Sequence, residues 1–386
     1  LQRPVSMVHL PPRLQENLLH NSGNLPKISP PVPTDEQKRL FSFPKVELHL
    51  HLDGSPRWQT ILDVAEKRGM SAGGAKTEEE LRKLVVTHEP ADLGRVLEAF
   101  SVFLPIIRGS AEALERIAYE TCKDQAASGV VYFEARYNAQ LLADVELTPL
   151  GVVEAVHRGL EKGRLDFGVD SRQILCCIRG LEQYDEQVVQ LIESCKDLGV
   201  VGIDVAGSAS GTDEQYQESV KRAFRMAKAL GIHRTAHAGE SGTDKEVLIA
   251  VNEMSAERIG HGYRILRSEQ SYKEYFVPGP NQKHNLHLEA CPYPSVMTGS
   301  VHWIGTTIPL HVGRRMKCRS RCLETTQPAS AILPCLNLLS PTPPSASAST
   351  SFGNVSLMRL SIASWRPTRR PNSLRESKLP SLLKIV

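Results

Sequence analysis

Between residues 44 and 303 the chain alternates short β-rich runs with amphipathic helical patterns, and this alternation constrains the fold more than any other feature. A strand followed by a helix and then another strand favours parallel strands with the helices packed outside them. Seven runs have the length and composition of buried strands: 45–51, 129–137, 173–179, 199–205, 233–238, 257–261 and 285–290. Seven such runs approach the eight strands of a (β/α)8 barrel.

A doubly wound open sheet is the alternative architecture. The barrel is favoured because polar residues cluster at the C-terminal ends of most of these runs, where barrel enzymes build their sites. An eighth strand is not recognisable, so an incomplete (β/α)8 TIM barrel is predicted. The long interval 52–128 is expected to hold several helices, inserted after the first strand as a lid. Residues 93–107 carry an apolar stripe typical of one helix in that lid.

The two ends of the chain differ in composition from the middle. Residues 1–43 are rich in proline and polar residues and are expected to form a flexible leader before the barrel at 44–303. Residues 304–386 hold 12 Lys and Arg against 2 Glu, with runs such as SPTPPSASASTS. This composition predicts a basic, disordered tail. It is also typical of a coding region translated in the wrong frame, an alternative hypothesis for the tail.

Composition also bears on location and partners. No run of 18 apolar residues exists, so no membrane span is expected. The spacing of the eight cysteines suggests no disulfide framework, and reduced buried thiols in a cytoplasmic protein are predicted. The basic tail has few aromatic side chains and no recognition motif, so nucleic acid is not expected as a partner.

The segment ELHLHLDGS (47–55) places two histidines in an apolar run. Because side chains alternate faces along a strand, His49 and His51 point the same way, and Asp53 joins them if the strand continues that far. Two such imidazoles can reach one Zn²⁺ ion at about 2.0–2.1 Å. The simpler interpretation, in which both rings are satisfied by backbone or water, is favoured by this motif alone.

Other strand ends add to the motif. The segment His237–Glu240 ends the fifth strand, His261 ends the sixth, and Asp204 and Gly207 end the fourth. A zinc ion held by imidazoles lowers the pKa of bound water to about 7 and so supplies a nucleophile at neutral pH. Burial would keep Glu240 protonated as an acid, and His261 could orient the attacking water. Together these residues predict metal-assisted hydrolysis at an unsaturated carbon.

Several blocks resemble one known family. PKVELHLHLDGS, HRTAHAGE, RIGHGYR and EACPYPS are similar, in order and spacing, to the signature blocks of adenosine deaminases, over residues 44–303. The resemblance implies a zinc-containing (β/α)8 barrel that hydrolyses adenosine and 2′-deoxyadenosine to inosines and ammonia in purine salvage. Phosphate-binding residues of an AMP deaminase are not identified. The H-x-E and P-C-x-x-C pair of cytosine deaminases is absent.

The resemblance also implies roles for individual residues. His49, His51 and His237 would bind one zinc ion per chain, and His51 would also border the substrate. Glu240 would protonate the purine ring nitrogen, and His261 would assist the attacking water. Asp53 would bind the ribose end, and the backbone at Gly207 would bind the purine.

One family block has no counterpart here. An S-L-N-T-D-D-P block, which supplies a zinc-binding and a purine-binding aspartate, normally follows 50–60 residues after GHGY, whereas Asp244 is the last aspartate of this sequence. The metal site is therefore expected to lack its fourth protein ligand. An inactive isoform or pseudoenzyme that binds metal or purine weakly is the alternative to an active deaminase.

Overall fold

The computed structural model describes residues 43–86, 93–208, 216–276 and 286–291, together with residues 35, 294, 295, 298 and 320–322. All of these lie in one compact unit within residues 1–340. The strands of this unit are β1 (Lys45–His51), β2 (Val130–Tyr137), β3 (Asp170–Ile178), β4 (Val200–Ala206), β5 (His233–Ala238), β6 (Arg258–His261), β7 (His287–Ala290) and β8 (Ser320–Cys322).

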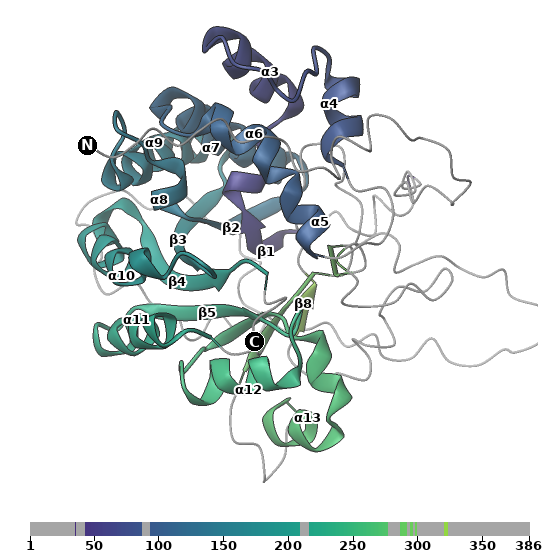
Figure 1. Cartoon of the computed structure of the whole chain (residues 1–386), viewed down its shortest axis with the longest axis vertical. Coiled ribbons are helices and arrows are strands. Elements are labelled where there is room, and N and C mark those ends of the chain that lie inside the picture. Colours follow the sequence, from purple (N-terminus) through teal and green to yellow (C-terminus); the bar gives the residue numbers. More distant parts are fainter. Residues whose placement is uncertain are drawn as a thin grey trace, which may run out of the picture. The chain divides into compact units, whose positions relative to one another are not determined.

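The strands form one parallel sheet in sequence order, from β1 to β8 (Figure 1). Each strand pairs in parallel with the next, for example Lys45 with Val130 and Ile259 with Leu288. His49 on β1 is hydrogen-bonded to Glu289 on β7, so the sheet curls until strands distant in sheet order meet across its interior. This arrangement confirms the predicted (β/α)8 barrel.

The eighth strand is the shortest of the barrel and lies at the edge of the sheet. Only three residues of the basic tail form β8, which pairs with β7 through Leu288 and Ser320. Within the described residues no strand pairing joins β8 to β1, so the barrel is nearly closed, as the prediction of an incomplete barrel required. No periodic pattern in the sequence predicted this short strand. The rest of the tail and most of the leader lie outside the described residues, and their boundaries remain predictions.

Helices lie between the successive strands from β1 to β7, and Figure 1 shows α7, α9, α10, α11 and α12 outside the sheet. The α-helices are α3 (Trp58–Lys67), α4 (Glu78–Val85), α5 (Leu93–Glu98), α6 (Phe100–Ile107), α7 (Ala111–Ala127), α8 (Ala139–Leu142), α9 (Pro149–Phe167), α10 (Asp185–Ser194), α11 (Glu218–Ala229), α12 (Asp244–Asn252) and α13 (Glu269–Phe276). Short 3₁₀ turns occupy η1 (Leu52–Gly54), η2 (Glu182–Tyr184), η3 (Lys196–Leu198) and η4 (Tyr263–Arg267).

The boundaries of the longest outer helices follow from local chemistry. In α9 the Thr148 hydroxyl accepts a hydrogen bond from the Gly151 N–H, Pro149 begins the helix, and Gly168 ends it at a φ of 68°. The helix packs closely on α7 because Gly159 and Gly163 have no side chain. A Cβ at Gly159 would lie only 2.2 Å from the carbonyl oxygen of Glu115.

The predicted helix over 93–107 is divided in two. It is interrupted at Ala99, so that α5 and α6 are separate helices. The Ser101 hydroxyl donates to the Glu98 carbonyl oxygen at 2.6 Å, and such a bond competes with regular helical pairing. The prediction of several helices between the first two strands is confirmed by η1 and α3 to α7.

Two composition-based expectations can be compared with the described residues. Among them Cys122, Cys176, Cys177, Cys195 and Cys291 are all buried free thiols. No helix within the described ranges has both the length and the apolar character needed to cross a bilayer.

Candidate metal centre

Three histidines from two strands meet at the C-terminal end of the barrel. His49 and His51 come from β1, and His237 comes from β5. One ring nitrogen of each can be chosen such that all three lie within 4.8 Å of one another. The His49 and His237 ring centres are 4.6 Å apart, and those of His51 and His237 are 5.0 Å apart. The structure thus brings together the three residues expected to bind metal.

The ring nitrogens of this cluster are arranged as metal ligands would be. The Nε2 atoms of His51 and His237 lie 3.0 Å apart. Two nitrogens bound to one tetrahedral zinc ion at about 2.05 Å would be about 3.3 Å apart. Burial lowers the pKa of His49 and of His51 well below the usual value, which favours the neutral imidazoles that metals require. The residues present therefore fit a bound metal ion.

Buried carboxylates hold the other side of two of these rings. His49 Nδ1 donates to Glu289 Oε2 at 2.8 Å, and His237 Nδ1 lies 3.0 Å from Asp204 Oδ2. A proton fixed on Nδ1 leaves Nε2 as the unprotonated, metal-binding nitrogen. This carboxylate–histidine arrangement is typical of metal sites in proteins.

An acid and a further histidine lie beside the cluster. Glu240 follows β5, and His261 ends β6. The Oε2 atom of Glu240 lies 3.4 Å from the Nε2 atom of His261. Burial raises the pKa of Glu240, which favours its protonated form. The other His261 nitrogen, Nδ1, is 2.9 Å from the Ser295 hydroxyl. His261 has a φ of 66°, a rare conformation for a residue with a side chain, and such strain is commonly found at functional sites.

Asp53 reaches the site by a different route from the one expected. The strand β1 ends at His51, and the 3₁₀ turn η1 carries Asp53, so strand alternation does not place it. Its Oδ1 atom is nevertheless 3.8 Å from His51 Nδ1. Burial raises the pKa of Asp53 to about 7, despite opposing backbone hydrogen bonds, including one from Asn138.

Gly207 and helix α6 complete the surroundings of the cluster. Gly207 directly follows β4 with a φ of 97°, and its carbonyl accepts a hydrogen bond from Arg179 at 2.6 Å. Phe100, the first residue of α6, lies against Gly54, where an added Cβ would be 3.1 Å from the Phe100 ring and 3.6 Å from His51 Cβ. The segment predicted as a lid therefore approaches the histidine cluster through Phe100.

Sequence reasoning missed the charged residues beneath the histidines. Glu289 lies two residues after His287 on β7, and Arg136 lies on β2; both are fully buried. Ser295, which contacts His261, was also missed as a site residue. The signal available was a charged residue inside an apolar strand run, which is costly to bury unless it is paired.

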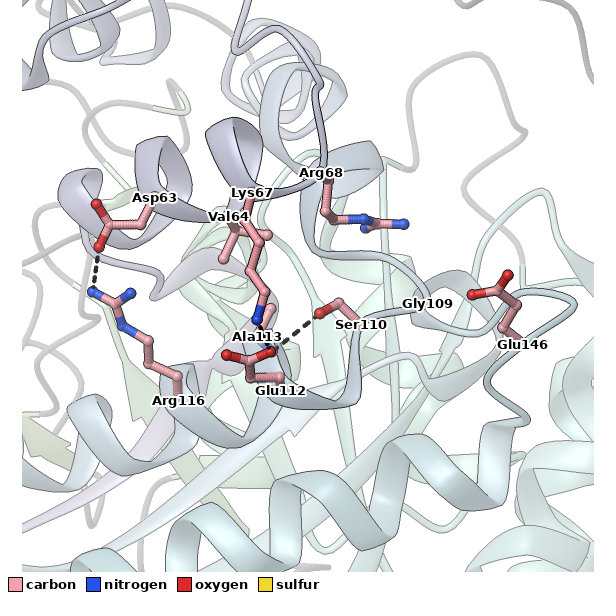
Figure 2. A pocket seen from close by; sticks show the side chains of 10 residues that line it. All are labelled: Asp63, Val64, Lys67, Arg68, Gly109, Ser110, Glu112, Ala113, Arg116 and Glu146. Atoms are coloured by element: carbon pink, nitrogen blue, oxygen red, sulfur yellow. Dashed lines mark hydrogen bonds and ion pairs between the residues drawn. The ribbon is translucent and has the colours of Figure 1, made fainter.

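A pocket lined by other residues than those of the metal centre lies beside helices α3 and α7. Helices α3 and α7 border a pocket of about 290 Å³, lined in part by Asp63, Lys67, Glu112 and Arg116 (Figure 2). Four of its charged side chains form two ion pairs: Lys67 with Glu112, and Arg116 with Asp63 at 2.8 Å. None of the predicted site residues lines this pocket, so it is not the candidate site.

The chain is similar to one known protein family over most of its length. A sequence profile of adenosine deaminases matches residues 44–316. The chain belongs to the adenosine deaminase family. The match confirms the resemblance seen in the sequence and extends it 13 residues beyond residue 303. By family the chain is a hydrolytic deaminase.

Curated adenosine deaminases are similar over most of their length. The protein of Danio rerio is 40% identical over 303 residues, which cover 75% of this chain and 82% of that protein. The protein of Gallus gallus is 41% identical over 276 residues, which cover 68% of this chain and 74% of that protein.

Several solved structures share the fold. An adenine deaminase from Arthrobacter aurescens superimposes with a TM-score of 0.65 at 23% identity, covering 74% of this chain and 83% of that one. A zinc-bound amidohydrolase from a Burkholderia species has a TM-score of 0.63 at 23% identity, covering 80% and 81%. Arabidopsis ADAL, solved as a complex with IMP, has a TM-score of 0.62 at 23% identity, covering 78% and 84%.

Proposed function

We propose that this chain is a zinc-dependent deaminase that hydrolyses adenosine and 2′-deoxyadenosine to inosine, 2′-deoxyinosine and ammonia. The observation that carries the proposal is the convergence of His49, His51 and His237 beside Glu240 and His261 at one end of the barrel. Membership of the adenosine deaminase family supports the nucleoside substrate. The zinc-bound amidohydrolase supports the choice of metal.

In this proposal the three imidazoles hold one zinc ion per chain. Bound there, zinc would supply the Lewis acidity that makes water a nucleophile at neutral pH. Glu289 and Asp204 keep the Nδ1 protons of His49 and His237 in place, which would leave both Nε2 atoms available to hold the metal.

The remaining residues act on the substrate and the water. Glu240, whose protonated form is favoured by burial, donates its proton to the purine ring nitrogen as the neighbouring carbon is attacked. His261 orients the water. One proton of that water passes to the amino group, which leaves as ammonia when the carbon–nitrogen bond breaks, and the other restores the acid form of Glu240. Asp53 binds the ribose end, and the backbone at Gly207 binds the purine. Phe100 and His51 both lie close to Gly54, which supports a role for α6 in covering the substrate.

The experiment is an assay of the purified full chain with adenosine and added zinc, read as inosine formed. We expect turnover that disappears on chelation and in Glu240→Gln, while Glu240→Gln still binds zinc. A Lys67→Ala variant in the pocket of Figure 2 is the control and should keep full turnover.

A second function is favoured by one observation. Asp244 is the last aspartate of the sequence, so the metal would have three imidazoles and no aspartate from the segment that follows β7. A pseudoenzyme that binds zinc or purine weakly would follow. Stoichiometric zinc without turnover would identify it and would refute the deaminase. A cytoplasmic location, like the absence of nucleic-acid partners, remains a prediction.

A further inference from the structure

One buried guanidinium lies beneath the metal centre and contacts three strands. Arg136 on β2 has no exposed side-chain surface. Its Nη1 atom donates to Asp204 Oδ2 on β4 at 2.7 Å, and its Nη2 atom donates to Glu289 Oε2 on β7 at 2.7 Å. Nη2 also donates to the Leu48 carbonyl on β1 at 2.5 Å. Arg136 therefore fixes three points around the barrel interior relative to one another.

The two carboxylates that Arg136 binds are the ones that orient the histidines. Glu289 Oε2 accepts from both Arg136 and His49, and Asp204 Oδ2 lies within 3.0 Å of both Arg136 and His237. The same oxygen atom is thus shared on each side. A continuous series of hydrogen bonds and ion pairs therefore runs from His49 through Glu289, Arg136 and Asp204 to His237.

The other contacts of Glu289 and Asp204 do not connect the two carboxylates to each other. Glu289 Oε1 is held by the Thr235 hydroxyl at 2.9 Å and by Arg258 Nε at 2.7 Å. Asp204 Oδ1 accepts from the Val205 N–H at 2.7 Å. Within the described residues only Arg136 donates to both carboxylates, and its planar fork sets their relative position, which a point charge such as lysine cannot do.

We propose that Arg136 is a positioning residue that sets the orientation and tautomer of His49 and His237 together, by binding Glu289 and Asp204 at once. The inference rests on the metal site proposed above and adds a residue that prepares it. The Arg136 guanidinium donates to Asp204, Glu289 and the Leu48 carbonyl, and in none of these described contacts does it bind a proposed metal ligand, although the Arg136 backbone pairs with His51 on β1. Its effect on His49 and His237 therefore passes through the two carboxylates.

The test compares Arg136→Lys and Arg136→Gln with a matched control, Arg234→Lys. Arg234 is also a buried arginine on a strand, and it donates to a carboxylate, Glu257, and to the main-chain carbonyls of Ser255 and Ile232. It touches neither Glu289 nor Asp204 in these contacts. Zinc affinity is measured on the full chain by competition with a chelator, and unfolding is followed in parallel.

We expect the Arg136 variants to bind zinc about 10- to 100-fold more weakly, as for other residues that orient metal ligands, and Arg234→Lys to bind within about threefold of wild type. A second readout is the ¹⁵N spectrum of histidine-labelled, metal-free protein. In wild type both rings should carry the proton on Nδ1, and in the variants a mixture with Nε2–H should appear.

Unchanged zinc affinity and unchanged tautomers in a folded Arg136→Lys protein would overturn the proposal. If neither Arg136 variant folds, the wild-type spectrum decides, since an Nε2–H proton on either histidine contradicts the arrangement. If wild type binds no zinc, the metal site itself fails, and the tautomer comparison still decides the role of Arg136.

Discussion

Gly260 on β6 lies directly against a proposed metal ligand, and its replacement by alanine gives a sharp test of the site. A Cβ at this position would be 2.7 Å from His49 Cε1 and 3.2 Å from His49 Nδ1. Ordinary contact begins at 3.4 Å, so the ring must recede by at least 0.7 Å, the difference between 3.4 and 2.7 Å. The bond from His49 to Glu289 opposes that movement.

The substitution is expected to impair function in a protein that still folds. Overpacking of this kind costs about 1–3 kcal/mol, whereas a catalytic group must be held within about 0.5 Å of its productive position. A misplacement of about 1 Å can reduce the rate roughly 100-fold. We therefore expect Gly260→Ala to fold, to bind zinc at least about 10-fold more weakly, and to lose about 100-fold in kcat/KM.

Gly202→Ala is the matched control, because Gly202 is a buried glycine of β4 in the same sheet. A Cβ there would be 3.1 Å from the His233 carbonyl oxygen, away from the histidine cluster. Zinc affinity, kcat/KM and denaturant unfolding are measured for both variants. The reasoning is refuted if Gly260→Ala folds and keeps wild-type zinc affinity and turnover, or if Gly202→Ala loses them equally.

Three further predictions follow from individual residues. Glu240→Gln should lower kcat by about 10²–10⁴-fold with little change in zinc affinity, because an amide cannot donate the acid proton; steady-state kinetics and metal titration check this. Burial acts to raise the pKa of Glu289, but Arg136 and Arg258 outweigh it and lower the pKa to about 2, from 4.5. Its ion pairs therefore stabilise the fold fully above pH 4.5 and lose their effect as the pH falls toward 2. The unfolding free-energy difference between metal-free wild type and Glu289→Gln should shrink by up to roughly 3 kcal/mol over that range, and a constant difference would contradict it. Arg116→Ala, in the pocket of Figure 2, should leave kcat/KM within about twofold and change stability by at most ~1 kcal/mol, since its ion pairs are partly exposed; a larger loss of activity would connect this pocket to the site.

The strands were predictable because each is a short apolar run between helical patterns. The predicted fifth strand, 233–238, matches β5 at both ends, while β3 begins at Asp170, three residues before the predicted 173. The first residues of β3 are polar, so they do not show the alternation of apolar and polar side chains that predicts a strand. The three-residue strand β8 could not be predicted, because a strand that short in a Ser- and Pro-rich segment carries no periodic signal.

The site was predictable only where its residues stand in local motifs. His49 and His51 are neighbours on one strand, so their spacing pointed to a shared ligand. Glu289 binds His49 across 240 residues of sequence, and Arg136 binds Glu289 across 153. Such pairs are created by the curl of the sheet, so no local pattern reveals them. The break between α5 and α6 likewise depends on one side-chain bond, that of Ser101, which hydrophobic periodicity does not register.

The most direct test of a zinc-dependent deaminase is a stepwise titration of the metal-free full chain with zinc, in which bound metal and inosine formation are measured in the same samples. The account predicts that turnover rises in proportion to bound zinc and reaches its maximum at one zinc ion per chain. Turnover that is the same with and without zinc, or one tightly bound zinc ion per chain with no inosine formed, would contradict it.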